Sequence, residues 1–415
     1  DFCLSRGLGD VYKRQDESIA EDILATQADT AVVVGTVSDY LTAKGDAKLY
    51  NINLPAGVYL QAQLTTPANA DLDYDLYLLD AEGNILTGSD YYTYINGTAG
   101  TLPEALGYIT SGDTATYYLY VLASEGGSVS ESFTLDYSVS TACDSYEIDE
   151  SVRQALAFTY GAGGAYIESR NLSSPIDNDW YVITVPSSRI YDKLKISATT
   201  ASTNTCSVEV YQNVASEGYQ MKRVGSGNTI SVSSGKYYIR VSNAKTMENF
   251  DDLDIQNYKL SITPILKATG IVITDLKGSE GLNKVVNYPG YGAHFRTQGS
   301  GTLTVYGVLT ATDSSTGVTY AVGGEQINGL YYSPAWEANN TSANAIRRGT
   351  GTTDSSGKFE IDISLPPGIG VYSYYGSTST HYFDICGVSV SPSDDSSISA
   401  SETIFHLAYT MYHPF

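Results

Sequence analysis

Short runs of alternating apolar and polar residues recur along the chain, and turns rich in Gly, Asn, Asp and Ser separate them. Clear examples are Leu49–Pro55, Trp180–Pro186 and Gly301–Ala311. Because successive residues of a β-strand face opposite sides of a sheet, each run predicts a strand with one apolar face. Strands of about five to eight residues bounded by such turns are typical of β-sandwiches. The pattern therefore predicts an all-β protein.

Four of these strands occur twice, in the same order, within the first two thirds of the chain. The matching pairs are Leu49–Pro55 with Trp180–Pro186, Tyr59–Thr66 with Asp192–Thr200, Tyr117–Val121 with Tyr237–Val241, and Phe133–Tyr137 with Tyr258–Ile262. Their offsets stay near 120 to 131 residues, so the duplicated unit is a whole domain and not a short motif. We expect two homologous β-sandwiches, module one at residues 31–141 and module two at residues 142–265.

Residues 266–415 have a different pattern, and we expect a third sandwich there. Two predicted strands, Gly301–Ala311 and Thr353–Ile363, are similar to those of carboxypeptidase-regulatory-like and related immunoglobulin-like modules. Between them, Gly323–Arg348 is interpreted as a long loop, and its aromatic residues are Tyr331, Tyr332 and Trp336. Long loops on rigid sandwiches often bind partners, so these three residues form a candidate binding surface. The alternative is a loop that folds down onto its own sandwich.

The first residues need separate treatment. Residues 1–15 resemble a translated sequencing adapter of the kind found in assembled environmental DNA, so we exclude them from the fold prediction. On this interpretation Cys3 is not a natural cysteine. Residues 16–30 then form an N-terminal segment whose Asp16-Glu-Ser start would suit a mature secreted bacterial chain.

The net charge of the chain limits the kinds of partner that we expect. Its 415 residues include 36 tyrosines and carry a net charge of −23, with the acidic residues scattered along the sequence. Nucleic-acid binding is disfavoured because no basic stripe is available to replace phosphate counterions. Calcium is a more natural ionic partner, although negative charge also simply keeps a secreted protein soluble. No run of 18 apolar residues occurs, so we expect no membrane span.

The residue types that usually carry hydrolysis form no catalytic motif, and we expect no enzyme. The histidines are His294, His381, His406 and His413, and they show neither an HExxH motif nor a neighbouring GxSxG motif. The last three could in principle bind zinc, but scattered histidines on strands are mostly ordinary surface residues. Cys386 lies in an apolar strand context, which favours a buried structural role.

Segments of both repeats resemble a known family. In module two these segments are Asp144–Ser151, Ser173–Tyr181 and Gly235–Val241, which together resemble the bacterial pre-peptidase C-terminal domain. Module one, with Asp71–Asp80 and Tyr117–Val121, looks like a more divergent copy. The resemblance implies two tandem secreted, jelly-roll-like sandwiches of about eight strands. Such domains are commonly appended to peptidases or other surface proteins.

The same resemblance implies a calcium site in module two. In the collagen-binding domains of clostridial collagenases, acids that lead into the sandwich meet aspartates just before an early strand. The corresponding residues are Glu147, Asp149 and Glu150 in the lead-in segment, residues 144–151, and Asp177 and Asp179 before the next strand. All are oxygen donors, as a hard cation requires. The alternative is that they only begin a turn and cap a strand. In module one only Asp46 precedes the equivalent strand, so we expect weak or no binding there.

Two cysteines of module two are candidates for a disulfide. Cys143 opens the module and Cys206 lies on one of its middle strands. In an oxidising exterior, a bond between them would close a loop of about 60 residues.

Two functions are consistent with these observations. The first is a secreted or cell-surface scaffold that binds an extracellular protein or polysaccharide, or copies of itself. The second is the non-catalytic accessory region of a secreted peptidase whose catalytic domain lies upstream. We favour the first because Asp16-Glu-Ser resembles a mature start.

Overall fold

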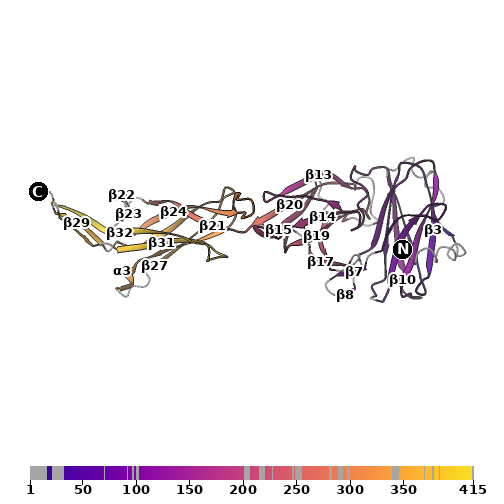
Figure 1. The fold of residues 1–415 in the computed structure, drawn as a ribbon, viewed down its shortest axis with the longest axis horizontal. Helices are drawn as coiled ribbons and strands as arrows, with labels where there is room; N and C mark the ends of the chain where they lie inside the picture. Colours follow the sequence, from indigo (N-terminus) through magenta and orange to yellow (C-terminus); the bar gives the residue numbers. More distant parts are fainter. Residues whose placement is uncertain are drawn as a thin grey trace. The chain divides into compact units, whose positions relative to one another are not determined.

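The protein is described by a computed structural model that covers residues 16–20, 32–69, 71–90, 92–95, 98–99, 102–200, 206–214, 220–226, 228–244, 247, 255–279, 283–287, 293–296, 300–338, 345–368, 370–375, 378–382 and 384–413. Its regular structure is almost all β (Figure 1), so the predicted fold class of tandem β-sandwiches is confirmed. No helix in these ranges is long and apolar enough to cross a membrane.

The chain forms two compact units. The first contains the described residues up to Ser187 together with Lys193–Ile265, and the second contains Ser188–Asp192 and the described residues from Leu266 onward. Modules one and two therefore lie in the same unit. The boundaries predicted at residues 141 and 265 stay predictions.

Module one is a sandwich of two antiparallel sheets. Its strands are β2 (Val32–Asp39), β3 (Ala47–Leu54), β4 (Tyr59–Thr65), β5 (Asp73–Leu79), β6 (Ile85–Ser89), β9 (Glu104–Ile109), β10 (Ala115–Glu125) and β11 (Phe133–Ser140). One sheet has the order β3-β10-β5-β6, and the other has the order β2-β11-β4-β9. A short strand, β1 (Asp16–Ala20), pairs in parallel with β3. The apolar residues that alternate along these strands, such as Ile52, Leu60 and Leu119, meet in one core.

Module two repeats this topology strand for strand. Its strands are β12 (Leu156–Ala157), β13 (Ala165–Leu172), β14 (Asn178–Val185), β15 (Tyr191–Thr200), β16 (Ser207–Asn213), β17 (Gln220–Ser226), β18 (Thr229–Ser231), β19 (Gly235–Ser242) and β20 (Gln256–Leu266). The sheet orders are β14-β19-β16-β17 and β13-β20-β15-β18. Just as β1 pairs with β3, β12 pairs in parallel with β14. The two modules thus share one strand order as well as similar sequences.

The two modules are joined by more than the chain between them. A segment of module one forms β7 (Tyr92–Ile95) and β8 (Thr98–Ala99), and β7 pairs in parallel with β17 of module two. Leu102 of module one also packs in a core cluster of module two with Trp180 and Met221. These contacts explain why the two modules form a single compact unit.

The second unit is also a sandwich. One sheet contains β21 (Gly270–Gly278), β24 (Gly301–Thr312), β25 (Thr319–Ala321) and β28 (Lys358–Leu365). The other contains β22 (Asn283–Asn287), β23 (Ala293–Arg296), β26 (Gln326–Tyr332), β27 (Ile346–Thr352), β29 (Gly370–Tyr375), β30 (Thr378–Tyr382), β31 (Asp384–Pro392) and β32 (Ala400–His413). Strict alternation of exposed and buried residues along β28 shows how the sequence pattern sets its two faces.

Candidate metal centre

The five acidic residues singled out in the sequence come together in module two. Carboxylate oxygens of Glu147, Glu150 and Asp177 lie within 4.8 Å of one another, and so do those of Glu147, Asp149 and Asp179. Because Glu147 belongs to both groups, the five side chains form one continuous cluster. We call it the acidic cluster.

Backbone hydrogen bonds place the lead-in segment against the start of β14. The amide of Trp180 donates to the carbonyl oxygen of Asp149 at 3.0 Å. The amide of Asn178 donates to Oε2 of Glu150 at 2.9 Å. These two bonds hold acids of the lead-in segment opposite Asp177 and Asp179. The five acidic side chains therefore come together because hydrogen bonds hold the lead-in segment against the start of β14.

The acidic cluster is buried and incompletely hydrogen-bonded. Four of its members are at most 1% exposed, while Glu147 is half-buried. Three oxygens have neither a hydrogen-bond donor nor an ion-pair partner: Oε2 of Glu147 and Oδ1 of Asp149 and Asp177. Oδ1 of Asp179 accepts no hydrogen bond either, but it lies 3.1 Å from the guanidinium of Arg170. A buried carboxylate oxygen without a donor is costly, and native proteins rarely leave one. The acidic cluster thus offers several carboxylate oxygens as ligands, and some of them lack a hydrogen-bond partner, as is expected of a cation site.

One buried arginine already neutralises part of this charge. Arg170 forms ion pairs with Asp144 at 2.8 Å and with Asp179 at 3.1 Å, and it also pairs with Asp149. Its Nε donates to the hydroxyl of Tyr181 at 2.7 Å. Arg170 thus pairs with three carboxylates, and Glu147, Glu150 and Asp177 complete a set of six, so full ionisation of all six leaves an excess of five negative charges.

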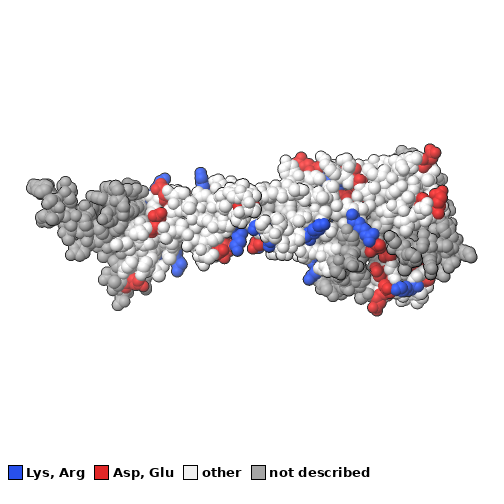
Figure 2. Space-filling model, in the orientation of Figure 1, with Lys and Arg blue, Asp and Glu red and all other residues white. Residues whose placement is uncertain are grey.

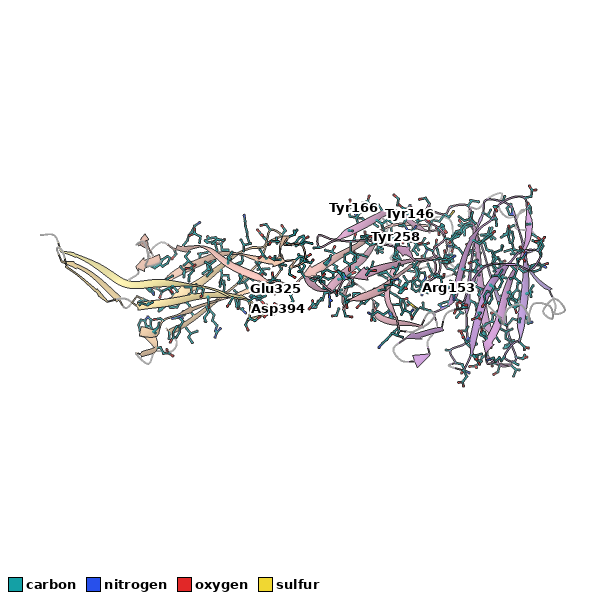
Figure 3. The ribbon with its side chains drawn as sticks, in the orientation of Figure 1. Tyr146, Arg153, Tyr166, Tyr258, Glu325 and Asp394 are labelled. Carbon is teal, nitrogen blue, oxygen red and sulfur yellow. The ribbon has the colours of Figure 1, made fainter. Side chains whose placement is uncertain are left out.

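A β-bulge directs Arg170 into the module. The register of β13 against β20 shifts between Ile167 and Arg170, and Ser169 within the shift has a left-handed φ of 62°. A non-glycine residue in that region is strained, and such strain persists where the surroundings enforce it. The ring of Tyr146, which is labelled in Figure 3, lies 5.0 Å from the Arg170 guanidinium carbon.

Burial and mutual repulsion raise the carboxyl pKa values of the acidic cluster. Burial, followed by the neighbouring carboxylates of Asp177 and Asp179, raises the pKa of Glu147 to about 9. Burial also raises the pKa of Asp177 to about 6 and the pKa values of Asp149, Glu150 and Asp179 well above their ordinary range. Without a cation, the cluster therefore holds protons at neutral pH. A divalent cation would compete with those protons.

Module one has a charge-swapped counterpart of the Arg170–Asp179 ion pair. In the matching strands, Lys48 stands where module two has Asp179, and Asp39 stands where it has Arg170. Lys48 Nζ lies 2.8 Å from Asp39 Oδ2, and the hydroxyl of Tyr50 donates to the same oxygen at 2.9 Å. A lysine at this position places a cation where module two gathers acids. This supports the expectation that module one binds metal weakly or not at all.

The disulfide predicted between Cys143 and Cys206 is absent from the structure, in which both are free thiols. Burial, with a smaller contribution from Asp179, raises the pKa of the Cys206 thiol to about 12. Burial and then Glu147 raise the pKa of the Cys143 thiol. Protonated thiols oxidise slowly because the thiolate is the reactive form. The spacing of the two cysteines in the sequence does not reveal that the pKa values of their thiols are raised.

The prediction of a long aromatic loop at Gly323–Arg348 is wrong. Its two ends belong to the paired strands β26 and β27, and the short helix α3 (Pro334–Ala338) lies between these strands in the sequence. Tyr331 is fully buried, and its hydroxyl lies 2.9 Å from His406 Nδ1 and 3.1 Å from Cys386 Sγ. The buried positions of β26 alternate, which turns Tyr331 inward.

The other two aromatic residues of that segment are held by local contacts. The hydroxyl of Tyr332 donates to Glu337, and Trp336 Nε1 donates to the carbonyl oxygen of Pro367 at 3.1 Å. The proposed binding surface therefore does not exist as a set of three exposed rings. The alternative, a segment folded against its sandwich, describes these residues better.

The histidines are only partly described. His406 and Cys386 are buried in the second unit, which agrees with a structural role for Cys386. His294, His381 and His413 lie on β23, β30 and β32, but their side chains lie outside the described part of the structure.

Known proteins are similar to parts of this chain. No protein-family model matches the chain. It is 36% identical to the YlqB protein of Bacillus subtilis (strain 168) over 74 residues, 18% of this chain and 46% of YlqB. The chain thus matches about half the length of that curated relative.

Several solved structures have limited similarity to the chain. The pre-peptidase C-terminal domain of the Bacillus anthracis collagenase is 13% identical, with 31% of this chain and 96% of that one covered and a TM-score of 0.19. A periplasmic inhibitor of g-type lysozyme from Aeromonas hydrophila is 9% identical, with 30% and 96% covered and a TM-score of 0.20. These likenesses are too distant to carry an argument about function.

Without divalent cations, stability should fall as pH rises. Carboxyl pKa values that are higher in the folded state than in the unfolded chain mean that the folded state binds more protons between the two values. The free energy of unfolding of the first unit should therefore decrease from about pH 5 to about pH 9. Thermal melts of the full chain in metal-free buffer test this. A melting temperature that rises over the same interval would contradict the raised pKa values.

Replacing Arg170 should destabilise the first unit far more than replacing an exposed arginine. Arg170→Met removes the guanidinium from the three carboxylates that it pairs with, those of Asp144, Asp149 and Asp179, and should cost about 3–5 kcal/mol. Arg153, which pairs with Asp90 and is 45% exposed, provides the matched control. Arg153→Met should cost less than about 1 kcal/mol. Chemical denaturation of both variants measures the difference, and equal losses would show that Arg170 does not neutralise the acidic cluster.

Proposed function

We propose that the chain is a non-catalytic, secreted or cell-surface β-sandwich protein whose first unit is stabilised by Ca²⁺. Its sandwiches serve as a scaffold that binds an extracellular protein, a polysaccharide or further copies of the chain. The observation that carries the proposal is the set of three buried carboxylate oxygens in one acidic cluster, on Glu147, Asp149 and Asp177, that have neither a hydrogen-bond donor nor an ion-pair partner.

The donor chemistry supports calcium over other common metals. Every candidate ligand in the acidic cluster is a carboxylate oxygen, whereas zinc sites usually include histidine or cysteine. Calcium also tolerates irregular arrangements of six to eight oxygens, while magnesium demands a near-ideal octahedron. The group formed by Glu147, Glu150 and Asp177 is the better position for an ion, because Arg170 pairs with the other group. Bound calcium would supply positive charge to the cluster.

The burial of reactive residues supports a non-catalytic role. Asp149, Glu150, Asp177 and Asp179 are almost fully buried, so a substrate could not reach them as a carboxylate pair. His406 is also fully buried. Among the described residues, these four carboxylates and His406 therefore cannot act as an exposed nucleophile and base.

The surface charge and the type of site support an extracellular location. On the visible face, the described acidic and basic side chains are interspersed without a broad basic patch (Figure 2), which does not favour a nucleic-acid partner. Calcium sites of extracellular modules typically bind with dissociation constants of about 0.1–1 mM. Such a site would be filled outside a cell, where calcium is abundant.

Calcium should raise the melting temperature of the first unit. At a calcium concentration of about 100 times the dissociation constant, a single site adds about 2.7 kcal/mol, or about 5–10 °C for a unit of this size. Asp177→Asn should abolish most of that shift. Glu168→Gln, on an exposed side chain of β13 in the same unit, should leave it intact. Melting curves of the full chain that are identical with calcium and with a chelator would contradict the proposal.

The full chain should not hydrolyse polymers. Purified protein incubated with casein, collagen or common polysaccharides should release no products above a buffer blank. Metal-dependent cleavage that disappears in a His381→Ala or His406→Ala variant would overturn the non-catalytic assignment.

A further inference from the structure

The acidic cluster is closed on one side by module one. Along β4, Leu60, Ala62 and Leu64 point into the core of module one. The intervening residues of the same strand therefore face outward. They are Tyr59, Gln61 and Gln63, which we call the docking face.

The docking face donates hydrogen bonds directly to a carboxylate of the acidic cluster. The hydroxyl of Tyr59 donates to Oε1 of Glu150 at 2.6 Å, and Nε2 of Gln61 donates to the same oxygen at 2.7 Å. Gln61 Oε1 in turn accepts a hydrogen bond from Ser174 Oγ of module two at 2.6 Å. Tyr59, Gln61 and Glu150 are each only 1% exposed. Two of the three hydrogen bonds that orient Glu150 thus come from the other module.

A glycine in module one makes this close approach possible. Gly107 on β9 is the pairing partner of Gln61 on β4. A Cβ atom at Gly107 would lie 2.5 Å from the hydroxyl oxygen of Tyr59 and 2.8 Å from Cγ of Glu150. Both distances are too short for real contacts. Glu150 therefore packs directly against the backbone of module one.

Other contacts of the junction do not involve the acidic cluster. Gln63 Oε1 accepts a hydrogen bond from Asn178 Nδ2 at 3.3 Å. The exposed pair of Arg153, labelled in Figure 3, and Asp90 also links the modules. These contacts provide references against which the role of Tyr59 and Gln61 can be measured.

We propose that calcium binding in module two and the docking of module one stabilise each other. Tyr59 and Gln61 are positioning residues: they fix the Glu150 carboxylate in the orientation that a bound cation needs. The ion in turn relieves the repulsion that Glu150 experiences in the acidic cluster, and so holds Glu150 against module one. Because coupling between two binding events is reciprocal, each should strengthen the other. This inference rests on the proposed calcium site.

The test compares calcium affinity in full-length variants by titration calorimetry. Tyr59→Phe removes one hydroxyl donor without changing the ring, and Gln61→Ala removes the amide donor. Each should weaken calcium binding about tenfold, as changes behind a metal ligand commonly do. Gln63→Ala, which removes a junction contact but no bond to a carboxylate of the cluster, should weaken binding less than Gln61→Ala does. Asn53→Ala, on an exposed side chain of β3 that bonds to Thr116 within module one, is the control and should change affinity less than about twofold. Far-UV spectra in chelator confirm that each variant is folded.

Hydrogen exchange provides a second readout that a merely structural role would not move. In the wild-type chain, calcium should slow amide exchange in β9 of module one as well as in module two. In Gln61→Ala, calcium at saturating concentration should still protect module two but should protect β9 less.

The outcomes separate this inference from the calcium site itself. A wild-type chain that binds no calcium would overturn both proposals. Normal calcium affinity in Tyr59→Phe and Gln61→Ala, with unchanged protection of β9, would overturn only the coupling and leave the calcium site in place.

Discussion

Repulsion among buried carboxylates is the constraint on which the first unit depends. Three acidic side chains pair with the guanidinium of Arg170, and three more lie in the same acidic cluster. In a medium that screens charge poorly, this arrangement is stable only if the carboxyl groups keep protons or gain a further cation. The lead-in segment, the start of β14 and the bulge of β13 all meet at this point. The shape of module two is thus closely tied to how its charge is balanced.

The two modules share a fold but differ in their charged residues. They share one strand order, yet module one replaces the Arg170–Asp179 pair with the reversed pair of Asp39 and Lys48. The reversal removes an acid from the position at which module two assembles its ligands. Module one instead contributes neutral hydrogen-bond donors from β4 to the site of its neighbour. Two modules with the same strand order can therefore enclose one acidic cluster between them.

The sequence was most informative where a local pattern decides the structure. Alternation predicted the strands, and the acids of the lead-in segment with Asp177 and Asp179 do form one cluster. Arg170 and Gln61 were missed because a polar residue on a strand gives no sign that it is buried against another segment. A bulge also hides the inward direction of Arg170 from the alternation rule. The segment that contains Tyr331 was interpreted as a long aromatic loop between two strands, although the alternating burial of β26 makes it a strand.

The central claim is that the acidic cluster exchanges protons for calcium. Calorimetric titration of calcium into the full chain at pH 7, repeated in buffers of different ionisation enthalpy, measures this exchange directly. The account predicts saturable binding, and the raised pKa values of Glu147 and Asp177 predict that binding releases protons. In Asp177→Asn this release should be lost together with most of the affinity. Saturable binding without proton release, or no binding at millimolar calcium, would contradict the account.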